Sequence, residues 1–445
     1  MRALDWPIRI DRLPHTREIF MPQAKFEDFT ISQVSRSNTT RKEKLIKFVL
    51  SIAIYVLLFS NLEVVGIVVQ FISIALLALT ALFSTSGRIR VGRLSLFEIA
   101  VYFCSFVSLP AAMFVSGRYY PDSTLNVVLY SVLTFMVISF IGVICASINI
   151  NHVMNSSSRA YVAMLVTILL FNYQDFLDAL TPGALNHWAL RARAFNLHPN
   201  LEGLIFAGGF LILLRQATLS RGIAKIIYFI FSIISCIVVM GASARASLLA
   251  MILSFTLMLA ISFPKLPRKY KQLIFFISII GLIGAFIFGG AIWNYVYDIL
   301  ELGSSTRGLD SGGSGRTELW QKGIALFASS LPQSVFGGGL RWSTADVIGF
   351  SVESSYITIF LDSGILAGGF LIISILFSLF RSASWALRRR NSRLQDVTIT
   401  TLILFSMFQG LFNRYLFAIG NPFSLIMLFI FTYASRGQSI TSPDD

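Results

Sequence analysis

The chain has few of the residues that build disulfides and metal sites: it contains 3 cysteines and 4 histidines. Cys104, Cys145 and Cys236 all lie in hydrophobic stretches, so the sequence indicates neither a disulfide framework nor a cysteine-rich metal site. His15 and His152 are expected in the cytoplasm, which argues against a zinc site built from histidines. A P-loop and a dinucleotide-binding fingerprint are also lacking. We therefore expect no metal and no other cofactor.

Charged residues are scarce as well, at 13% of the chain, whereas hydrophobic residues make up 55% and include 40 phenylalanines. Water-soluble domains do not have this composition. Because a helix needs about 20 apolar residues to cross a bilayer, the sequence predicts an all-α polytopic membrane protein with about twelve transmembrane helices. Uninterrupted apolar runs favour helices over the alternating strands of a barrel. The twelve segments are 45–60, 63–83, 94–115, 125–147, 160–173, 200–215, 223–242, 246–263, 272–297, 354–380, 397–413 and 419–435.

Positive charge predicts which helix ends face the cytoplasm. With the N-terminus inside, 27 of the 36 Lys and Arg residues fall in cytoplasmic segments, as the positive-inside rule requires. The net charge of +14 then reflects topology and anionic lipids, and it needs no nucleic acid to explain it. The polar, basic start of the chain has no apolar stretch, so we expect no signal peptide.

This topology divides the chain into five parts, with both termini in the cytoplasm. Residues 1–44 form a basic cytoplasmic segment, and residues 45–299 hold the first nine transmembrane helices, with an outer loop at 173–199. Residues 300–352 form a large periplasmic loop with an amphipathic helix. Residues 353–435 hold the last three helices, and residues 436–445 form a cytoplasmic tail.

Of the nine cations expected outside, eight are arginine. The planar guanidinium grips a carboxylate or phosphate through two hydrogen bonds, which lysine cannot do. One outer arginine alone is equally compatible with snorkelling to headgroups or capping a helix. The whole set, gathered in the outer loops, favours an anion site. Its members are Arg118, Arg191, Arg193, Arg245, Arg307, Arg316, Lys322, Arg341 and Arg414.

Arg245 lies in GASARASLL, a short break between two hydrophobic segments. An arginine at membrane depth costs roughly 2.5–3.5 kcal/mol on insertion scales, so it usually faces a cavity or a partner. Small neighbours let backbones approach closely and leave room for a ligand headgroup. Asp298 and Glu301 are alternative, structural partners.

The outer loop before the sixth segment carries Arg191 and Arg193 and ends in NLHPN. Proline suits the first position of a helix, so His198, Pro199 and Asn200 predict a helix start. The histidine is then either an interfacial residue or part of a second wall of the outer site.

In the large loop, Arg316 opens RTELWQKGIALFASSL, which has the pattern of an amphipathic helix on a membrane surface. Gly312, Gly313 and Gly315 precede it and permit unusual backbone geometry at a helix N-terminus, where anions are favoured. Trp320 is suited to stacking on a sugar or to anchoring the helix at the interface.

Several motifs, in this order, resemble those of a known family. They are His198–Asn200, Arg245 in GASARASLL, SGRTELW at Ser314–Trp320, the cluster Gly337–Gly339, and ESSYITIFLDSGILAG at Glu353–Gly368. The chain resembles the O-antigen ligase and polymerase superfamily, particularly its exopolysaccharide polymerase (ExoQ-like, Wzy-type) branch.

The resemblance implies a glycosyltransferase C-type fold in the bacterial inner membrane and a metal-independent reaction. The implied substrate is a polyprenyl-pyrophosphate-linked oligosaccharide on the periplasmic face, whose pyrophosphate is gripped by outer arginines. A polymerase would move the growing chain onto the non-reducing end of the next lipid-linked repeat unit. A ligase would move finished chains to another acceptor. Implied partners are the lipid bilayer and a chain-length regulator and flippase of the same pathway.

The chain departs from the family where a histidine followed by asparagine often stands, because it has Glu353 and Ser354 there. Glu353 is a candidate general base if burial tunes its pKa. The alternative is an ion pair between Glu353 and Arg341 or Arg414. Asp362 is a secondary candidate, although its position in a span favours a helix-packing group.

We expect a polymerase. Its reaction is expected to invert the anomeric centre, because the sequence indicates one carboxylate base rather than two. The predicted catalytic residues are Glu353 as base, with Arg316 and Arg245 on the pyrophosphate. The alternatives are a ligase of the O-antigen type and, in another class, a transporter that flips lipid-linked oligosaccharides. A transporter would have polar residues near span centres and an internal repeat, neither of which is evident. The predicted substrate-binding residues are Arg191, Arg193, His198, Asn200, Trp320, Arg341 and Arg414.

Overall fold

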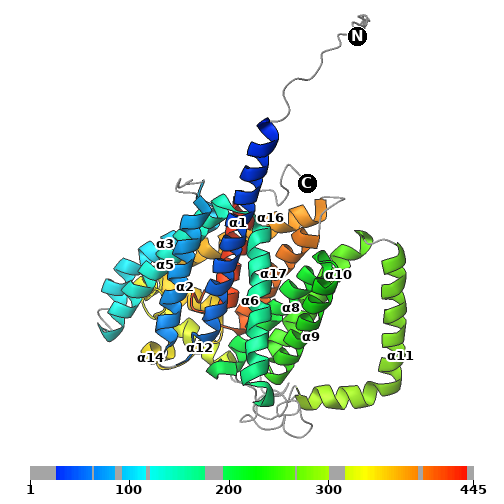
Figure 1. Cartoon of the computed structure of the whole chain (residues 1–445). Helices are drawn as coiled ribbons and strands as arrows, with labels where there is room; N and C mark the ends of the chain where they lie inside the picture. Colours follow the sequence, from blue (N-terminus) through cyan, green and yellow to red (C-terminus); the bar gives the residue numbers. More distant parts are fainter. Residues whose placement is uncertain are drawn as a thin grey trace, which may run out of the picture. The chain divides into compact units, whose positions relative to one another are not determined.

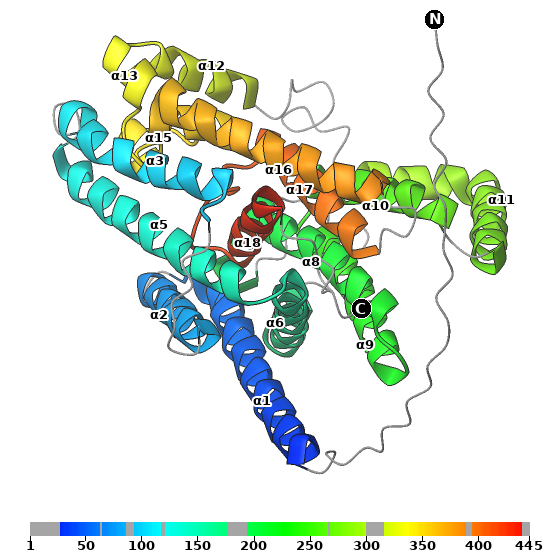
Figure 2. The ribbon, with the colours of Figure 1, turned by 90° about the horizontal axis from the view of Figure 1, so that it is seen from above.

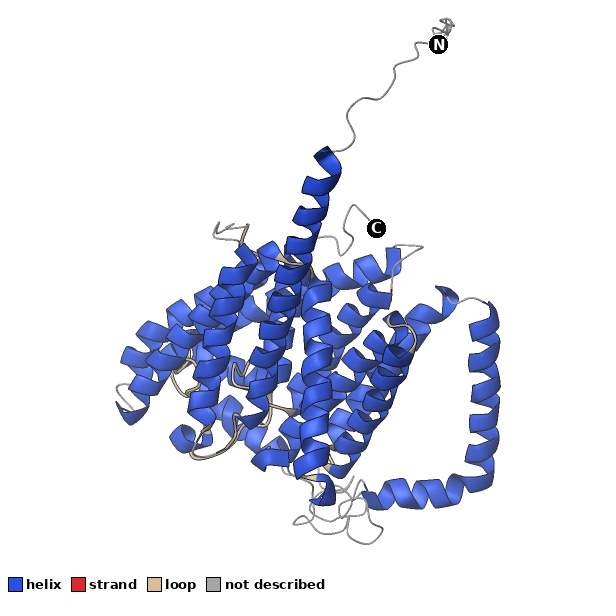
Figure 3. Ribbon diagram, in the orientation of Figure 1, coloured by secondary structure: helices blue, strands red, loops and turns tan. Residues whose placement is uncertain are grey.

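The computed structural model describes residues 27–62, 65–85, 93–116, 121–175, 194–265, 268–299, 316–388 and 394–437. Every regular element in these ranges is a helix, as Figure 3 shows, and no strand occurs among them. The predicted all-α class is therefore confirmed. Contacts divide the chain into a small unit, 1–45, and a large unit, 46–445, that holds nearly all of the helices.

Twelve long helices each overlap one of the predicted hydrophobic segments (Figure 1). They are α1 (Glu27–Val56), α2 (Gly66–Thr85), α3 (Leu96–Ala111), α5 (Pro121–Ser147), α6 (Ile150–Phe171), α8 (Pro199–Leu219), α9 (Ile223–Gly241), α10 (Arg245–Ser262), α11 (Arg268–Ile299), α16 (Gly369–Arg388), α17 (Leu394–Phe412) and α18 (Pro422–Arg436). The shorter helices are α12 (Arg316–Phe327), α13 (Leu331–Phe336), α14 (Ala345–Ile348) and α15 (Ser355–Ser363). The helical turns are η1 (Leu57–Phe59), η2 (Ala112–Ser116), η5 (Ala194–Asn196), η6 (Phe263–Lys265) and η8 (Gly364–Gly368).

Among the described residues, 8 helices are long and apolar enough to cross a membrane. One of them, Ser355–Leu387, is continuous through α15, η8 and α16, and Val397–Phe412 and Pro422–Arg436 form shorter apolar helices. These helices support the predicted polytopic membrane protein. The part of the predicted outer loop that the structure describes, 316–352, holds only the short helices α12, α13 and α14.

One predicted boundary is wrong: α6 begins at Ile150 and not near residue 160. Asn149 caps the helix by accepting a hydrogen bond from the backbone N–H of Asn151. In the polar run that follows, Ser157 and Ser158 each donate to the carbonyl four residues earlier, which satisfies their buried hydroxyls within the helix. Serine hydroxyls satisfied in this way can be buried inside a helix that hydropathy alone would cut short.

The core is built around α18 and α8, whose residues are buried over almost their whole length. Figure 2 shows α18 end-on, surrounded by its neighbours, and it contacts α3, α5, α6, α8, α16 and α17. The outward faces of α2, α9 and α10 carry exposed Phe, Leu and Ile residues. A bilayer would cover these faces without cost.

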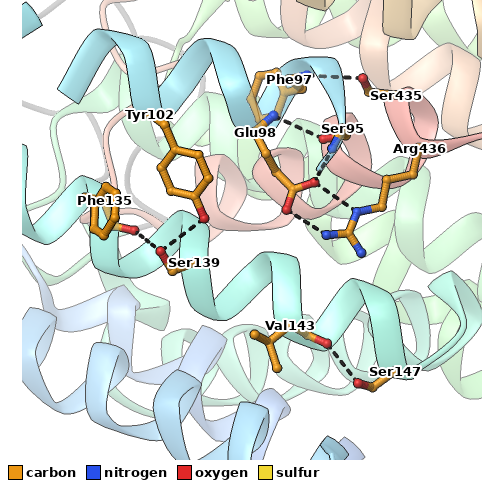
Figure 4. Close-up of polar contacts among 10 residues, drawn as sticks. All are labelled: Ser95, Phe97, Glu98, Tyr102, Phe135, Ser139, Val143, Ser147, Ser435 and Arg436. Atoms are coloured by element: carbon orange, nitrogen blue, oxygen red, sulfur yellow. Dashed lines mark hydrogen bonds and ion pairs between the residues drawn. The ribbon is translucent and has the colours of Figure 1, made fainter. Parts of the chain in front are cut away.

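A buried ion pair joins the start of α3 to the end of α18 (Figure 4). Arg436 donates two hydrogen bonds to Glu98, from Nε to Oε2 at 2.9 Å and from Nη2 to Oε1 at 2.7 Å. Glu98 also accepts from the backbone N–H of Ser95, whose hydroxyl accepts from the N–H of Glu98 in return. This reciprocal capping arrangement fixes the carboxylate at the helix start. The pair therefore holds the two helices in register at the end expected to face the cytoplasm.

We predict that Glu98→Ala destabilises the protein by about 3–5 kcal/mol, because it leaves the Arg436 charge buried without its partner. The matched control is Glu318→Ala, which removes the partner of Lys322 in an exposed pair of the same 2.7 Å separation. Exposed pairs contribute little, so the control should unfold at the wild-type temperature. Thermal unfolding of the purified proteins in detergent measures both. Equal effects of the two substitutions would contradict the structural role of the buried pair.

Candidate functional site

A cavity of about 250 Å³ is lined by α2, α5, α15, the loop before α15 and the turn between α17 and α18. Arg341 and Arg414, two of the predicted substrate-binding residues, both lie in its wall. The other polar groups of the wall include Asn61, Gln70, Tyr130, Thr134, Ser343, Thr358, Asp362, Tyr415 and Asn421.

The glycine cluster Gly337–Gly339 brings Arg341 to this cavity. The backbone N–H of Gly338 donates to the carbonyl of Leu361 at 2.8 Å, and that of Gly339 donates to the carbonyl of Asp362 at 2.8 Å. These carbonyls belong to the last turn of α15, whose final carbonyls have no partner within the helix. A Cβ on Gly337 would lie 2.5 Å from the backbone of Asp362. The loop therefore docks backbone to backbone, at a distance that only glycine permits.

Asp362 controls the direction of Arg341. Its buried carboxylate accepts from the backbone N–H of Arg341 at 3.0 Å and from that of Ser343 at 2.8 Å. Arg341 has a φ of 65°, a left-handed conformation that costs a residue with a Cβ roughly 1–2 kcal/mol. Two charge-assisted hydrogen bonds offset this cost. The Arg341 guanidinium lies 4.1 Å from the ring centroid of Tyr130. Asp362 is thus more than a helix-packing group.

Arg316 and Glu353 interact electrostatically, although neither lines the cavity. Arg316 is the first residue of α12, and its guanidinium lies 5.8 Å from the ring centroid of Phe412. Burial lowers the pKa of Arg316 from its ordinary value, and the nearby Glu353 carboxylate opposes that shift. Trp320 packs against the same Phe412 ring, with centroids 6.3 Å apart. The motif that begins at Arg316 therefore faces the end of α17.

Tyr415 lines the cavity and also interacts electrostatically with Glu353. Burial raises the pKa of Tyr415, while Arg414 opposes the shift and Glu353 adds to it. The Arg414 guanidinium lies 5.4 Å from the Tyr415 ring centroid. Arg414 and Glu353 thus both lie close to one tyrosine, whose ring also lines the cavity.

One carboxylate oxygen of Glu353 has a hydrogen-bond partner, and the other is buried without one among the described residues. Its Oε1 accepts a hydrogen bond from the Ser351 hydroxyl at 2.9 Å, and its buried Oε2 has no partner in the described part of the chain. Within that part, neither Arg341 nor Arg414 forms an ion pair with Glu353 at 4.0 Å or less. Among the described residues, Glu353 thus lacks the ion pair to Arg341 or Arg414 that the sequence offered as the alternative to a base.

Arg245 starts α10, beside the end of α17. The Gln409 side chain of α17 donates to the carbonyl of Ala246 at 3.0 Å and accepts from Ser247. The expected room for a headgroup is not found among the small neighbours: a Cβ on Gly203 of α8 would lie 2.2 Å from the Cβ of Ala244. They allow helices to pack, and Arg245 does not line the cavity. Its alternative partners, the side chains of Asp298 and Glu301, lie outside the described residues.

The predicted helix start at NLHPN is confirmed. His198 is the N-cap of α8 and its side chain accepts from the backbone N–H of Asn200 at 3.3 Å, while Pro199 takes the first helical position. Neither His198 nor Asn200 lines the cavity. Arg191 and Arg193 lie outside the described residues, as do the glycines at 312, 313 and 315.

The sequence did not single out several residues of this site. Ser108 accepts from the backbone N–H of Leu340 at 2.6 Å and so attaches the loop to α3. Asn421 caps α18 by accepting from Ser424, a role that the Asn-Pro pair could have indicated. No sequence pattern indicates Tyr130, because its contact with Arg341 depends on a loop that is distant in the chain.

No protein-family model and no curated protein matches the sequence. Among the described residues, no group of three or more His, Cys, Asp or Glu side chains could hold a metal ion. The chemistry of the site is therefore inferred from its arginines, its carboxylate and its cavity.

We predict that Gly337→Ala undocks the loop, because the new Cβ would overlap the backbone of Asp362. Gly349→Ala is the matched control, since Gly349 also has a positive φ, of 79°, but has nothing within 4 Å of its Cβ position. The control should lose only the roughly 1–2 kcal/mol of left-handed strain. Thermal unfolding in detergent compares the two. Similar losses of thermal stability in the two variants would show that the close approach of Gly337 to the backbone of Asp362 does not hold the loop in place.

Proposed function

We propose that the chain is a polysaccharide polymerase that works on polyprenyl-pyrophosphate-linked oligosaccharides at the periplasmic face of a bacterial inner membrane. The observation that carries the proposal is a polar cavity walled by Arg341, Arg414 and Tyr415, with the Glu353 carboxylate acting electrostatically both on Tyr415 and on Arg316. An anion-binding group next to a base and a cavity is what transfer from a pyrophosphate leaving group requires.

The arrangement of helix ends supports an outer location for this cluster. Hydrogen bonds bring together the start of α10, the end of α17 and the start of α15: Gln409 reaches Ala246, and Ser355 donates to the carbonyl of Asn413. If the twelve long helical segments all cross the membrane, each of these ends faces outward in the topology that positive charge predicts. Twelve spans and a glycosyltransferase C-type fold, with both termini cytoplasmic, are part of the proposal.

The proposed reaction is a direct displacement. The acceptor hydroxyl oxygen attacks the anomeric carbon of the donor, the bond from that carbon to the pyrophosphate oxygen breaks, and polyprenyl pyrophosphate leaves with inversion. Glu353 takes the hydroxyl proton on its available oxygen. Arg316 and Arg245 stabilise the charge that develops on the leaving group. The donor is already activated, so no nucleotide is consumed.

Two observations favour an enzyme over a transporter. Three buried charged residues, Glu98, Glu202 and Arg215, lie near the ends of α3 and α8, and a fourth, Asp362, binds the backbone of the loop at the end of α15, whereas a transporter places such groups near the span centres. The arginines of the site gather at one end of the helices. Polymerase is preferred to ligase because SGRTELW resembles the polymerase branch more closely.

We predict that Arg316→Ala abolishes polymer formation in a host that lacks the native protein, because the leaving pyrophosphate loses its bidentate partner. Arg316→Lys should restore only part of the activity, since lysine keeps the charge without the planar fork. Lys322→Ala, six residues further along α12 and exposed, is the matched control and should be active. Polymer is measured on gels after membrane insertion is verified. Wild-type polymer from Arg316→Ala would overturn the assignment.

We predict that Glu353→Gln lowers the turnover rate by a factor of about 10²–10⁴, the usual contribution of a general base. Glutamine keeps the shape and the hydrogen bond from Ser351 but cannot take a proton. The acid limb of the pH–rate profile should also disappear in the variant. An unchanged rate with an unchanged profile would mean that Glu353 only shapes the loop.

A further inference from the structure

The two arginines of the cavity are each held against an aromatic ring. Arg341 lies over Tyr130 at 4.1 Å and Arg414 over Tyr415 at 5.4 Å, measured to the ring centroids. Within the described part of the chain neither guanidinium forms an ion pair. Stacking holds the face of the Arg341 guanidinium and leaves its N–H edge for a ligand, whereas the Arg414 guanidinium also hydrogen-bonds to the Tyr415 side chain and has its other N–H groups left. The cavity wall therefore presents two positioned donors for an anion.

The rest of the cavity suits a sugar ring. Its wall mixes apolar side chains, such as Ile359 and Phe417, with polar ones such as Gln70. The hydroxyl of Thr358 in this wall is buried and has no hydrogen-bond partner among the described residues. The volume of about 250 Å³ is below the roughly 300–1,000 Å³ of pockets for drug-sized ligands, which fits the short end of a glycan.

The proposed binding site for the pyrophosphate lies outside the cavity. Arg316 and Arg245 are the residues proposed to hold it, and neither lines the cavity. Arg414 and Tyr415 line the cavity, and the Glu353 carboxylate acts electrostatically on Tyr415. A glycan end in the cavity would thus lie close to Glu353, the proposed base, while the donor is held at Arg316 outside the cavity.

We propose that this cavity binds an acidic sugar of the acceptor, one whose ring carries a carboxylate gripped by Arg341 and Arg414. The inference rests on the proposed function and names its substrate class: a repeat unit with a carboxylated sugar at or next to its non-reducing end. Asp362 acts as the positioning residue, because its carboxylate holds the backbone of Arg341 in the conformation that turns the side chain toward Tyr130.

The test is direct binding to the full chain in lipid nanodiscs, measured by calorimetry at one fixed salt concentration. The probes are a disaccharide that ends in glucuronic acid, its neutral counterpart that ends in glucose, and farnesyl pyrophosphate. We expect the acidic disaccharide to bind about tenfold more tightly than the neutral one, the factor that a charge-assisted hydrogen-bonded pair supplies.

Arg341→Gln and Arg414→Gln should each abolish that preference and leave the neutral disaccharide bound as before. Arg341→Gln should also leave farnesyl pyrophosphate binding unchanged. Lys322→Gln is the matched control: it removes one positive charge from the same side of the protein, does not line the cavity, and should keep the preference.

Three results would overturn the inference, and they are distinguishable. Equal binding of both disaccharides, with farnesyl pyrophosphate still bound, rejects the acidic sugar alone and leaves the polymerase proposal in place. Loss of farnesyl pyrophosphate binding in Arg341→Gln, with the sugar preference retained, assigns the cavity to the lipid pyrophosphate. Failure of all three probes to bind the wild-type chain rejects the proposed function and this inference together.

Discussion

The candidate site depends on how the chain satisfies a helix break inside a membrane span. Ser355–Leu387 is apolar enough to cross a bilayer, yet its α-helix stops at Ser363 and resumes at Gly369. Lipid offers no hydrogen bonds, so the backbone groups freed by such a break must find protein partners. The outer loop supplies them through Gly338 and Gly339, and the Asp362 carboxylate accepts two of the loop's N–H groups in return. One backbone contact thus closes the break and builds a wall of the cavity.

The two ends of the helical unit use arginine differently. At the end that the proposed topology places inside, Arg436 is neutralised by Glu98 through two hydrogen bonds, which fixes α3 against α18. At the end that the proposed topology places outside, Arg316, Arg341 and Arg414 lie over aromatic rings, and none of them forms an ion pair among the described residues. A stacked guanidinium is held in place while its hydrogen-bonding edge stays available. The inner arginine therefore stabilises the fold, and the outer ones are suited to binding a ligand.

Hydropathy predicted the helices well, because burial in lipid or in a helical core demands the same apolar runs. The His198–Asn200 helix start could also be predicted, since capping and the proline position are local. The start of α6 could not, because hydropathy does not register serines that bond back to their own helix. The role of Asp362 and the stacking of Arg341 on Tyr130 depend on a loop that returns from elsewhere in the chain, which no local pattern encodes.

The most direct test of the account is a profile of lipid-linked glycans in membranes of a host that lacks this protein. Polymerase function predicts that single repeat units accumulate on polyprenyl pyrophosphate, facing outward. Long polymer stranded on the lipid would indicate a ligase instead, and single units held on the cytoplasmic leaflet would indicate a flippase. Either of those results, or a profile identical to that of the parent strain, would contradict the proposed polymerase.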